Sequence, residues 1–390
     1  MKRYRVAVTG AAAVMAAVAA SVAMHGEYGN MDIGGGSDAQ HAKSIRLGYF
    51  PVVGHAIPIV GLEQGIFQER LPGVRIDARV FDSGPQVVES MFAGSIDVAY
   101  LGPGPAINAF LNSEDGRIRI LSGAASGGTS FVMHPDVASP EFDFAHKRVA
   151  APQIGNTQDV SLRHYMAERG LMAADRGGSV VLYNIPNPDI VTLFVKGEID
   201  GDWVSEPWAT VLVEGHGGVR LFYEESMWPG GEFATVLLVA DMGYVEANPG
   251  VIRAWLDAHE ESARVINSDK DEAGVAFNEF LLKHFGQQLG PEVVRTAVHN
   301  TKVTTNQLDG TVYEFAERAD RLGYMGRGGY DLSGLFLFEN VTATGVSDVP
   351  PLAAAAAPAT APTSAAKLPI LATAMTASTE GAAPVPPLEV

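Results

Sequence analysis

At residues 151–160 the chain reads Ala151-Pro152-Gln153-Ile154-Gly155-Asn156-Thr157-Gln158-Asp159-Val160. A short apolar strand ends here and passes through a glycine into a polar helix start, for which Asn156 or Thr157 is the natural N-cap. The first turn of a helix leaves backbone N–H groups without intrahelical partners. The junction therefore predicts a site for a small anion, with Asn156, Thr157 and Gln158 as contacts. The alternative is that Asp159 in the first turn simply complements the helix dipole.

The same strand-to-helix step recurs along the chain. Apolar runs predict strands at 45–49, 74–81, 96–100, 118–121, 148–151 and 180–183. Between them, helices are predicted at 55–64, 85–93, 105–111, 157–169 and 188–196, and the stretch after Val251 is mostly helical. Alternation at this spacing predicts an α/β fold with parallel sheets covered on both faces.

The composition of the chain excludes several classes of function. The chain has 390 residues, 47% of them hydrophobic, which is enough for one large domain or two smaller ones. Its formal charge of −18 opposes binding to nucleic acid or to an anionic membrane. It contains no Cys, which excludes disulfides, Cys-ligated zinc, thiol catalysis and a lipidated Cys anchor.

Both ends of the chain differ from its middle. Lys2, Arg3 and Arg5 precede a small-residue apolar run at 6–23, a pattern typical of a signal peptide. Residues 24–43 are Gly-rich and polar and are expected to be a linker, and the Ala/Pro-rich tail at 347–390 is expected to be disordered. We expect a periplasmic or otherwise extracytoplasmic protein that is exported and is not a lipoprotein.

Two further junctions have unusual residues. Phe50 and His55 flank the first strand-to-helix turn and could face a ligand, although an ordinary β–α turn is the alternative. Gly102 and Pro103 open a Gly-Pro-Gly-Pro bend after the third strand, at the sheet edge where α/β proteins bind ligands. Ile107 stands where a dinucleotide fingerprint needs a small residue, so dinucleotide binding is not expected.

A run of small residues follows the strand at 118–121. Gly127 and Gly128 allow close backbone approach, and Ser126 can donate a hydroxyl hydrogen. Because no Lys or Arg is present in this run, it suits a sulfonate-like or nitrate-like anion bound by neutral dipoles.

The stretch 199–208 combines Trp203, Trp208 and Glu206. Trp203 could form a wall for an aliphatic or aromatic tail, and Glu206 could bind an ammonium or hydroxyl group. The structural alternative places Trp208 in the core and makes Glu206 a helix cap.

Enzyme signatures are otherwise missing from the sequence. It has no Gly-x-Ser-x-Gly elbow and no His or Cys spacing for a metal, and its ten His are scattered. Arg163 and His164 are expected to be solvated helix residues. We therefore expect no catalytic residues, no metal and no cofactor.

Several segments together resemble the solute-binding proteins of ABC importers in the nitrate/taurine/aliphatic-sulfonate group, and most of all the aliphatic-sulfonate branch. The matching segments span 44–340 and lie at 47–51, 92–100, 123–128, 152–159, 197–208 and 332–335.

The resemblance implies a two-lobed periplasmic-binding-protein fold of type II, in which each lobe is a mixed sheet flanked by helices. Lobe one would hold 44–130 and 237–340, lobe two 131–236, and the ligand would lie in the cleft between them. The anion would contact the helix start at His55, Gly102-Pro103, the junction 126–128 and the helix start at 156–158. Trp203 and Glu206 would face the rest of the solute.

By the same resemblance, the chain is expected to be a monomer that captures a small anion, an aliphatic sulfonate or taurine, and delivers it to a permease with its ATPase. Two alternatives stay open: an enzyme on this scaffold acting on a pyrimidine or quinone precursor, and a sensory module.

Overall fold

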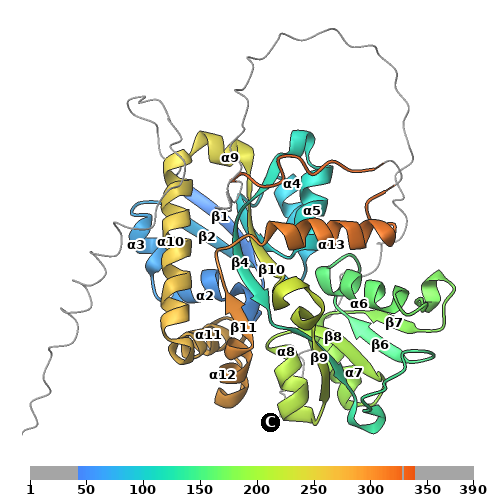
Figure 1. Cartoon of the computed structure of the whole chain (residues 1–390). Helices are drawn as coiled ribbons and strands as arrows, with labels where there is room; N and C mark the ends of the chain where they lie inside the picture. The colour runs from blue at the N-terminus through green and yellow to red at the C-terminus, as the bar shows by residue number, and fades with distance from the viewer. Residues whose placement is uncertain (1–42, 327–328, 339–390) are drawn as a thin grey trace, which may run out of the picture. The chain divides into compact units, whose positions relative to one another are not determined.

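The computed structural model describes residues 43–326 and 329–338, which form an α/β fold with two mixed sheets flanked by helices (Figure 1). The expected signal peptide at 1–23 and the expected tail at 347–390 lie outside the described residues, as does the expected linker except for Lys43. We call the first sheet with its helices lobe one and the second lobe two.

The sheet of lobe one has six strands in the order β11-β4-β10-β3-β1-β2. Their bounds are β1 Ser44–Tyr49, β2 Arg75–Val80, β3 Val98–Leu101, β4 Ile118–Gly127, β10 Ala234–Asp241 and β11 Thr301–Val303. Strands β2, β1 and β3 are parallel, as predicted. β10 and β11 pair in the antiparallel direction, so an all-parallel sheet is wrong.

The sheet of lobe two has five strands in the order β7-β6-β8-β5-β9. Their bounds are β5 Thr129–Met133, β6 Arg148–Ala151, β7 Val181–Asn184, β8 Gly201–Ser205 and β9 Val219–Tyr223. β7, β6 and β8 are parallel, whereas β5 and β9 are antiparallel to their neighbours. The chain passes directly from β4 in the first sheet to β5 in the second, and it returns from β9 to β10 through short 3-10 turns.

The helices follow the predicted order. They are α2 Ala56–Glu63, α3 Ile66–Arg70, α4 Gly84–Phe92, α5 Pro103–Asn112, α6 Thr157–Ala167, α7 Asn187–Val195, α8 Trp208–Thr210, α9 Met242–Ala247, α10 Pro249–Ser268, α11 Lys270–Phe285, α12 Pro291–His299 and α13 Asp309–Arg321. Two short turns matter for the site, η1 Val53–His55 and η6 Glu224–Met227. Gly94 and Gly170 follow α4 and α6 with φ of 64° and 69°, a conformation that glycine adopts without strain.

Each sheet is buried on both faces, because successive side chains of its central strands enter different clusters. On β3, Tyr100 belongs to the cluster under α10 and α11, and Leu101 to the cluster under α5 and α13. On β8, Trp203 packs with α6 and Val204 with α7. This period of two fixes the register of the strands, and with it the residues that reach the sheet edge.

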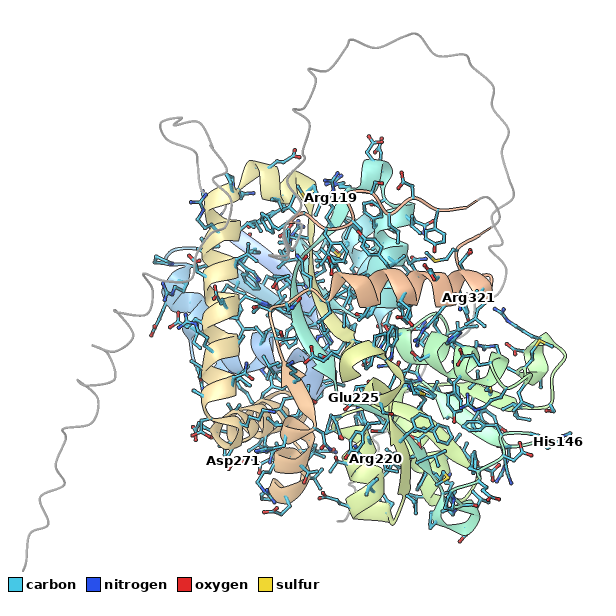
Figure 2. All side chains as sticks on the ribbon, viewed as in Figure 1. Arg119, His146, Arg220, Glu225, Asp271 and Arg321 are labelled. Carbon is cyan, nitrogen blue, oxygen red and sulfur yellow. The ribbon has the colours of Figure 1, made fainter. Side chains whose placement is uncertain are left out.

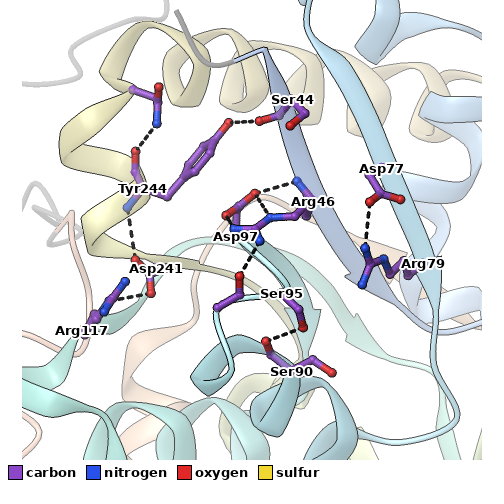
Figure 3. A network of polar contacts seen from close by, with 12 residues as sticks. Ser44, Arg46, Asp77, Arg79, Ser90, Ser95, Asp97, Arg117, Asp241 and Tyr244 are labelled. Atoms are coloured by element: carbon purple, nitrogen blue, oxygen red, sulfur yellow. Dashed lines mark hydrogen bonds and ion pairs between the residues drawn. The ribbon is translucent and has the colours of Figure 1, made fainter.

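An arginine–aspartate clasp ties the first strand of lobe one to the loop before β3 (Figure 3). Asp97 is buried and accepts hydrogen bonds from the Arg46 backbone N–H at 2.8 Å and from Nε at 2.9 Å. The Arg46 guanidinium also donates to the Gly94 carbonyl and forms an ion pair with Asp97.

Lobe two repeats this clasp. Asp200 accepts from the Arg148 backbone N–H at 2.8 Å, and Arg148 Nη2 donates to the Gly197 carbonyl at 3.0 Å. The two lobes therefore share a strand–helix–strand plan, with β1, β2 and β3 corresponding to β6, β7 and β8.

Candidate functional site

The candidate residues gather where β1, β3, β6 and β8 end. These carboxyl ends lead into η1, α5, α6 and α8, so helix starts from both lobes lie at one boundary. In open α/β sheets this edge is where ligands bind.

The starts of α5 and α6 touch across the lobes. The backbone N–H of Gly104 donates to Thr157 Oγ1 at 3.4 Å. A Cβ atom on Gly102 would lie 2.3 Å from the same Oγ1, so only glycine permits this approach. The predicted residues Gly102, Pro103 and Thr157 are thus brought together.

Asn156 is the N-cap residue of α6, but its side chain makes no capping hydrogen bond. Gln158 is half-buried in the first turn. Because the cap is unused, the amide of Asn156 stays available for a bound group.

Asp159 lies in the same turn and is fully buried. Its carboxylate accepts from the Gly155 backbone N–H at 3.0 Å, Arg163 Nε at 2.9 Å, Asn184 Nδ2 at 2.8 Å and the Tyr324 hydroxyl at 2.7 Å. Asp159 therefore does more than complement the helix dipole, because it also joins lobe two to the segment after α13.

The expectation that Arg163 and His164 are solvated is wrong, since their exposed fractions are 4% and 8%. Arg163 is buried because it forms the ion pair with Asp159. Burial, followed by the charge of Arg318, lowers the pKa of His164 below its ordinary value.

Phe50 and His55 lie against each other in lobe one, with ring centroids 4.6 Å apart. His55 Nδ1 accepts from the Phe50 backbone N–H at 3.2 Å. Burial lowers the pKa of His55 to about 3, so its imidazole is neutral at physiological pH. Its contribution to an anion site would be that of a dipole.

The junction between β4 and β5 contains Ser126, Gly127 and Gly128. Ser126 Oγ accepts from the Phe233 backbone N–H at 3.2 Å. The two glycines have φ of 67° and 71°, and Gly128 leaves no room for a Cβ beside Thr301. The run of small residues is thus required by the direct crossing between the two sheets.

Glu206 is 1% exposed, and all of its carboxylate bonds are within the protein. Oε2 accepts from the Thr210 backbone N–H at 3.0 Å, which ties Glu206 to the short helix α8, whose N-cap residue is Pro207. Oε1 accepts from Arg220 Nη2 at 3.1 Å and from Asn300 Nδ2 at 2.9 Å. The backbone of Glu206 also bridges the lobes, since its carbonyl accepts from the Val53 N–H at 3.1 Å.

Trp203 is fully buried in lobe two, while Trp208 is partly buried against the α7 side of the sheet. Trp203 Nε1 donates to Glu224 at 2.6 Å, and Ser161 Oγ donates to the other Glu224 oxygen at 2.6 Å. These three residues line a cavity of about 80 Å³. Burial raises the pKa of Glu224 to about 7, and the two hydrogen bonds oppose this shift.

A larger cavity has a volume of about 380 Å³ and is lined by Arg220, Asn300, Phe222 and Tyr223. It lies beside Glu206, because Arg220 and Asn300 both donate to the Glu206 carboxylate. Of the twelve predicted contacts, Trp203 alone lines either of these two cavities. Sequence reasoning missed Arg220 and Asn300 because neither belongs to a motif and their position depends on pairing across the lobes.

Among residues 43–326 and 329–338, no cluster of three or more His, Cys, Asp or Glu is placed to hold a metal ion. No helix in these ranges is both long and apolar enough to cross a bilayer. The starts of α5 and α6 and the β4–β5 junction thus bring glycines and small polar side chains from both lobes together.

The family model described as the NMT1-like family matches residues 38–277, which is well over half of the chain. The chain belongs to the NMT1-like family. Within the family model's range lie all four helix starts and both crossings between the sheets.

Two curated proteins are similar to this family member. The taurine-binding periplasmic protein of Escherichia coli (strain K12) is 27% identical over 183 residues, which are 47% of this chain and 55% of that protein. A binding protein of Brucella abortus (strain 2308) is 25% identical over 220 residues, 56% of this chain and 65% of that protein. The chain thus spans less than two thirds of the length of these relatives.

Solved structures show the same fold. The alkanesulfonate-binding protein SsuA from Xanthomonas axonopodis pv. citri bound to MOPS has a TM-score of 0.61 at 17% identity, covering 74% of this chain and 96% of that one. The periplasmic nitrate-binding protein NrtA from Synechocystis PCC 6803 has a TM-score of 0.59 at 17% identity, with 74% and 83% covered. The two-lobed fold with mixed sheets, which the resemblance implied, is confirmed.

Proposed function

We propose that the chain is the extracytoplasmic solute-binding component of an ABC importer, which captures a small sulfonate-type anion and delivers it to a permease. The contact of Gly104 N–H with Thr157 Oγ1 carries this proposal, because it brings the N-termini of α5 and α6 from opposite lobes to one point. The similarity to proteins named for taurine, alkanesulfonate and nitrate supports the same class of solute.

Electrostatics favour a local anion site. With a formal charge of −18, the chain as a whole repels an anion, so binding depends on donors directed at one place. The unused cap of Asn156 supports such a place, at the point where the starts of α5 and α6 meet through Gly104 and Thr157.

Thermal unfolding of the full chain tests the proposal against taurine, short and long alkanesulfonates, nitrate, sulfate and bicarbonate. A ligand at a hundredfold its Kd adds about 2.7 kcal/mol to the free energy of unfolding, which is a readily measured shift. No shift with any sulfonate or with nitrate would contradict the proposal, and conversion of a bound compound to product would favour an enzyme instead.

Two substitutions locate the site. Asn156→Ala and Thr157→Ala should each weaken binding of the best ligand by about 1–3 kcal/mol, because buried polar groups lose a partner. Asn112→Ala and Thr192→Ala are matched controls, since both side chains bond to backbone on exposed helix faces. Isothermal titration calorimetry gives the affinities, and unchanged binding in both site variants would place the anion elsewhere.

A further inference from the structure

A tyrosine of lobe one reaches into the first turn of α6 in lobe two. Gly323 follows the end of α13 with φ of 79°, and its backbone N–H donates to the Asp320 carbonyl at 2.7 Å. The backbone N–H of Tyr324 donates to the Ala319 carbonyl at 3.0 Å. These two bonds form a Schellman motif, which holds Tyr324 against the end of α13. From this position the Tyr324 hydroxyl donates to Asp159 Oδ2 at 2.7 Å.

Asp159 in turn positions the candidate anion site. The oxygen that accepts from Tyr324 also accepts from the Gly155 backbone N–H at 3.0 Å. Gly155 immediately precedes Asn156 and Thr157, the candidate contacts at the start of α6. The carboxylate of Asp159 therefore fixes the turn that carries both contacts. Of the four donors that the described residues provide to it, three belong to lobe two, and only Tyr324 belongs to lobe one.

We propose that Tyr324 is a positioning residue of the solute site, which holds the first turn of α6 through Asp159 while the lobes are closed and thereby slows release of the solute. This inference rests on the proposed function and adds to it the contact that controls release. Tyr324 itself does not touch the solute, because it acts through the carboxylate of Asp159.

Arg176 holds the same segment of lobe one from a second point in lobe two. It ends the short turn η4 Ala174–Arg176, and its Nη1 donates to the Leu322 carbonyl at 2.6 Å. Its guanidinium carbon lies 5.2 Å from the centre of the Tyr324 ring, a distance typical of a cation–π contact. We call the contacts of segment 322–324 with Asp159 and Arg176 the latch.

The latch lies away from the crossings between the two sheets. Among residues 43–326, the chain crosses at the β4–β5 junction and in the segment between β9 and β10. Figure 2 shows Arg321, at the end of α13, well apart from Glu225, which belongs to the second crossing. A hinge motion changes the backbone at such crossings and moves each lobe as a rigid body. The latch must therefore break when the lobes separate, whereas contacts at the crossings can persist.

The Tyr324 hydroxyl remains a hydrogen-bond donor at physiological pH. Burial, followed by the charge of Asp159, raises the pKa of Tyr324 above its ordinary value. Asp159 is fully buried, and a donor stabilises a buried carboxylate more than it stabilises one in water. Since hydrogen bonds to charged groups are the stronger class, loss of this one should make separation of the lobes about tenfold more frequent.

The test follows the release of a radiolabelled solute from the full chain after an excess of the unlabelled compound is added. The probe is ethanesulfonate or taurine, whichever binds the parent chain more tightly. Tyr324→Phe removes only the hydroxyl, so release should become about tenfold faster, while the association rate changes by less than about twofold. Arg176→Ala removes the second contact of the latch and should speed release by about threefold.

Tyr244→Phe is the matched control. The Tyr244 hydroxyl donates to the Ser44 carbonyl at 2.9 Å, and both residues belong to lobe one. The control therefore loses a comparable hydrogen bond that does not join the lobes, and its release rate should equal that of the parent chain. Urea denaturation without solute shows that both Phe variants are folded.

The outcomes separate the two proposals. If Tyr324→Phe releases the probe at the parent rate, or if Tyr244→Phe speeds release equally, the latch is overturned while the sulfonate receptor stands. If the parent chain binds neither compound, the proposed function itself fails, and the latch fails with it as a device for release.

Discussion

Lobe one and lobe two build the site edge from the same parts but complete it differently. In both, an arginine on the first strand clasps the aspartate that precedes the third strand. Six residues after that aspartate, lobe one has Pro103 at the start of α5, whereas lobe two has Glu206 before α8. At the boundary between the lobes, lobe one thus places small residues, whereas lobe two places a buried ion pair.

The difference extends into the third strands. Ala99 on β3 pairs with Gly48, and Asp202 on β8 holds the corresponding place opposite Ala150. Asp202 is fully buried, neither of its oxygens has a partner among the described residues, and burial raises its pKa well above the ordinary value. The site edge of lobe two therefore has buried carboxyl groups, Asp202 and Glu206, where lobe one has Ala99 and Pro103, which predicts that the stability of lobe two depends on pairing and on pH.

Removing Arg220 should have the largest effect on stability, and it tests whether lobe two depends on its buried ion pair. Arg220→Ala leaves the carboxylate of Glu206 buried without its cation and should lower the free energy of unfolding by about 3–5 kcal/mol. Urea denaturation measures the loss, and Arg295→Ala, at an exposed ion pair, should show no measurable change. Adding Glu206→Gln to Arg220→Ala should recover part of the loss; a further loss would mean that the charge of Glu206 is compensated by another group.

Glu224 should make stability depend on pH. Its pKa of about 7 in the folded protein lies above the ordinary 4.5, so the folded state binds more protons and stability falls as pH rises from 4.5 to 7. The free-energy difference between Glu224→Gln and the parent should rise by about 3 kcal/mol across this window, in favour of the variant. Denaturation curves at pH 5, 6, 7 and 8 measure it, and a constant difference would show that Glu224 is ionised throughout.

Local signals explain how much of the fold could be predicted. The starts of α5 and α6 and the glycines after α4 and α6 follow from residues adjacent in sequence, so their positions were found to within a few residues. The antiparallel direction of β5, β9, β10 and β11 depends on pairing between distant segments, which the local pattern does not contain.

The candidate site divides in the same way. Gly102, Asn156 and Thr157 stand at helix starts that the sequence itself marks. Arg220 and Asn300 reach Glu206 only after β9 has paired with β5 and α12 has packed against α8. One further signal was present: Gly-x-Ile-Asp occurs at 94–97 and again at 197–200, and it marks the equivalent clasps of the two lobes.

Replacing Asp202 gives the smallest expected change in stability, but it tests the difference between the two third strands most directly. Asp202→Ala gives β8 the residue that β3 has at the corresponding position. An unpartnered buried carboxyl costs about 1–3 kcal/mol, and the small cavity left by its removal offsets part of the gain. The variant should therefore be more stable than the parent by about 1–2 kcal/mol at pH 7. Thermal and urea unfolding measure the change, with exposed Asp136→Ala as the control. If Asp202→Ala is instead destabilising, the Asp202 carboxyl has a hydrogen-bond partner in solution, and its burial stabilises lobe two.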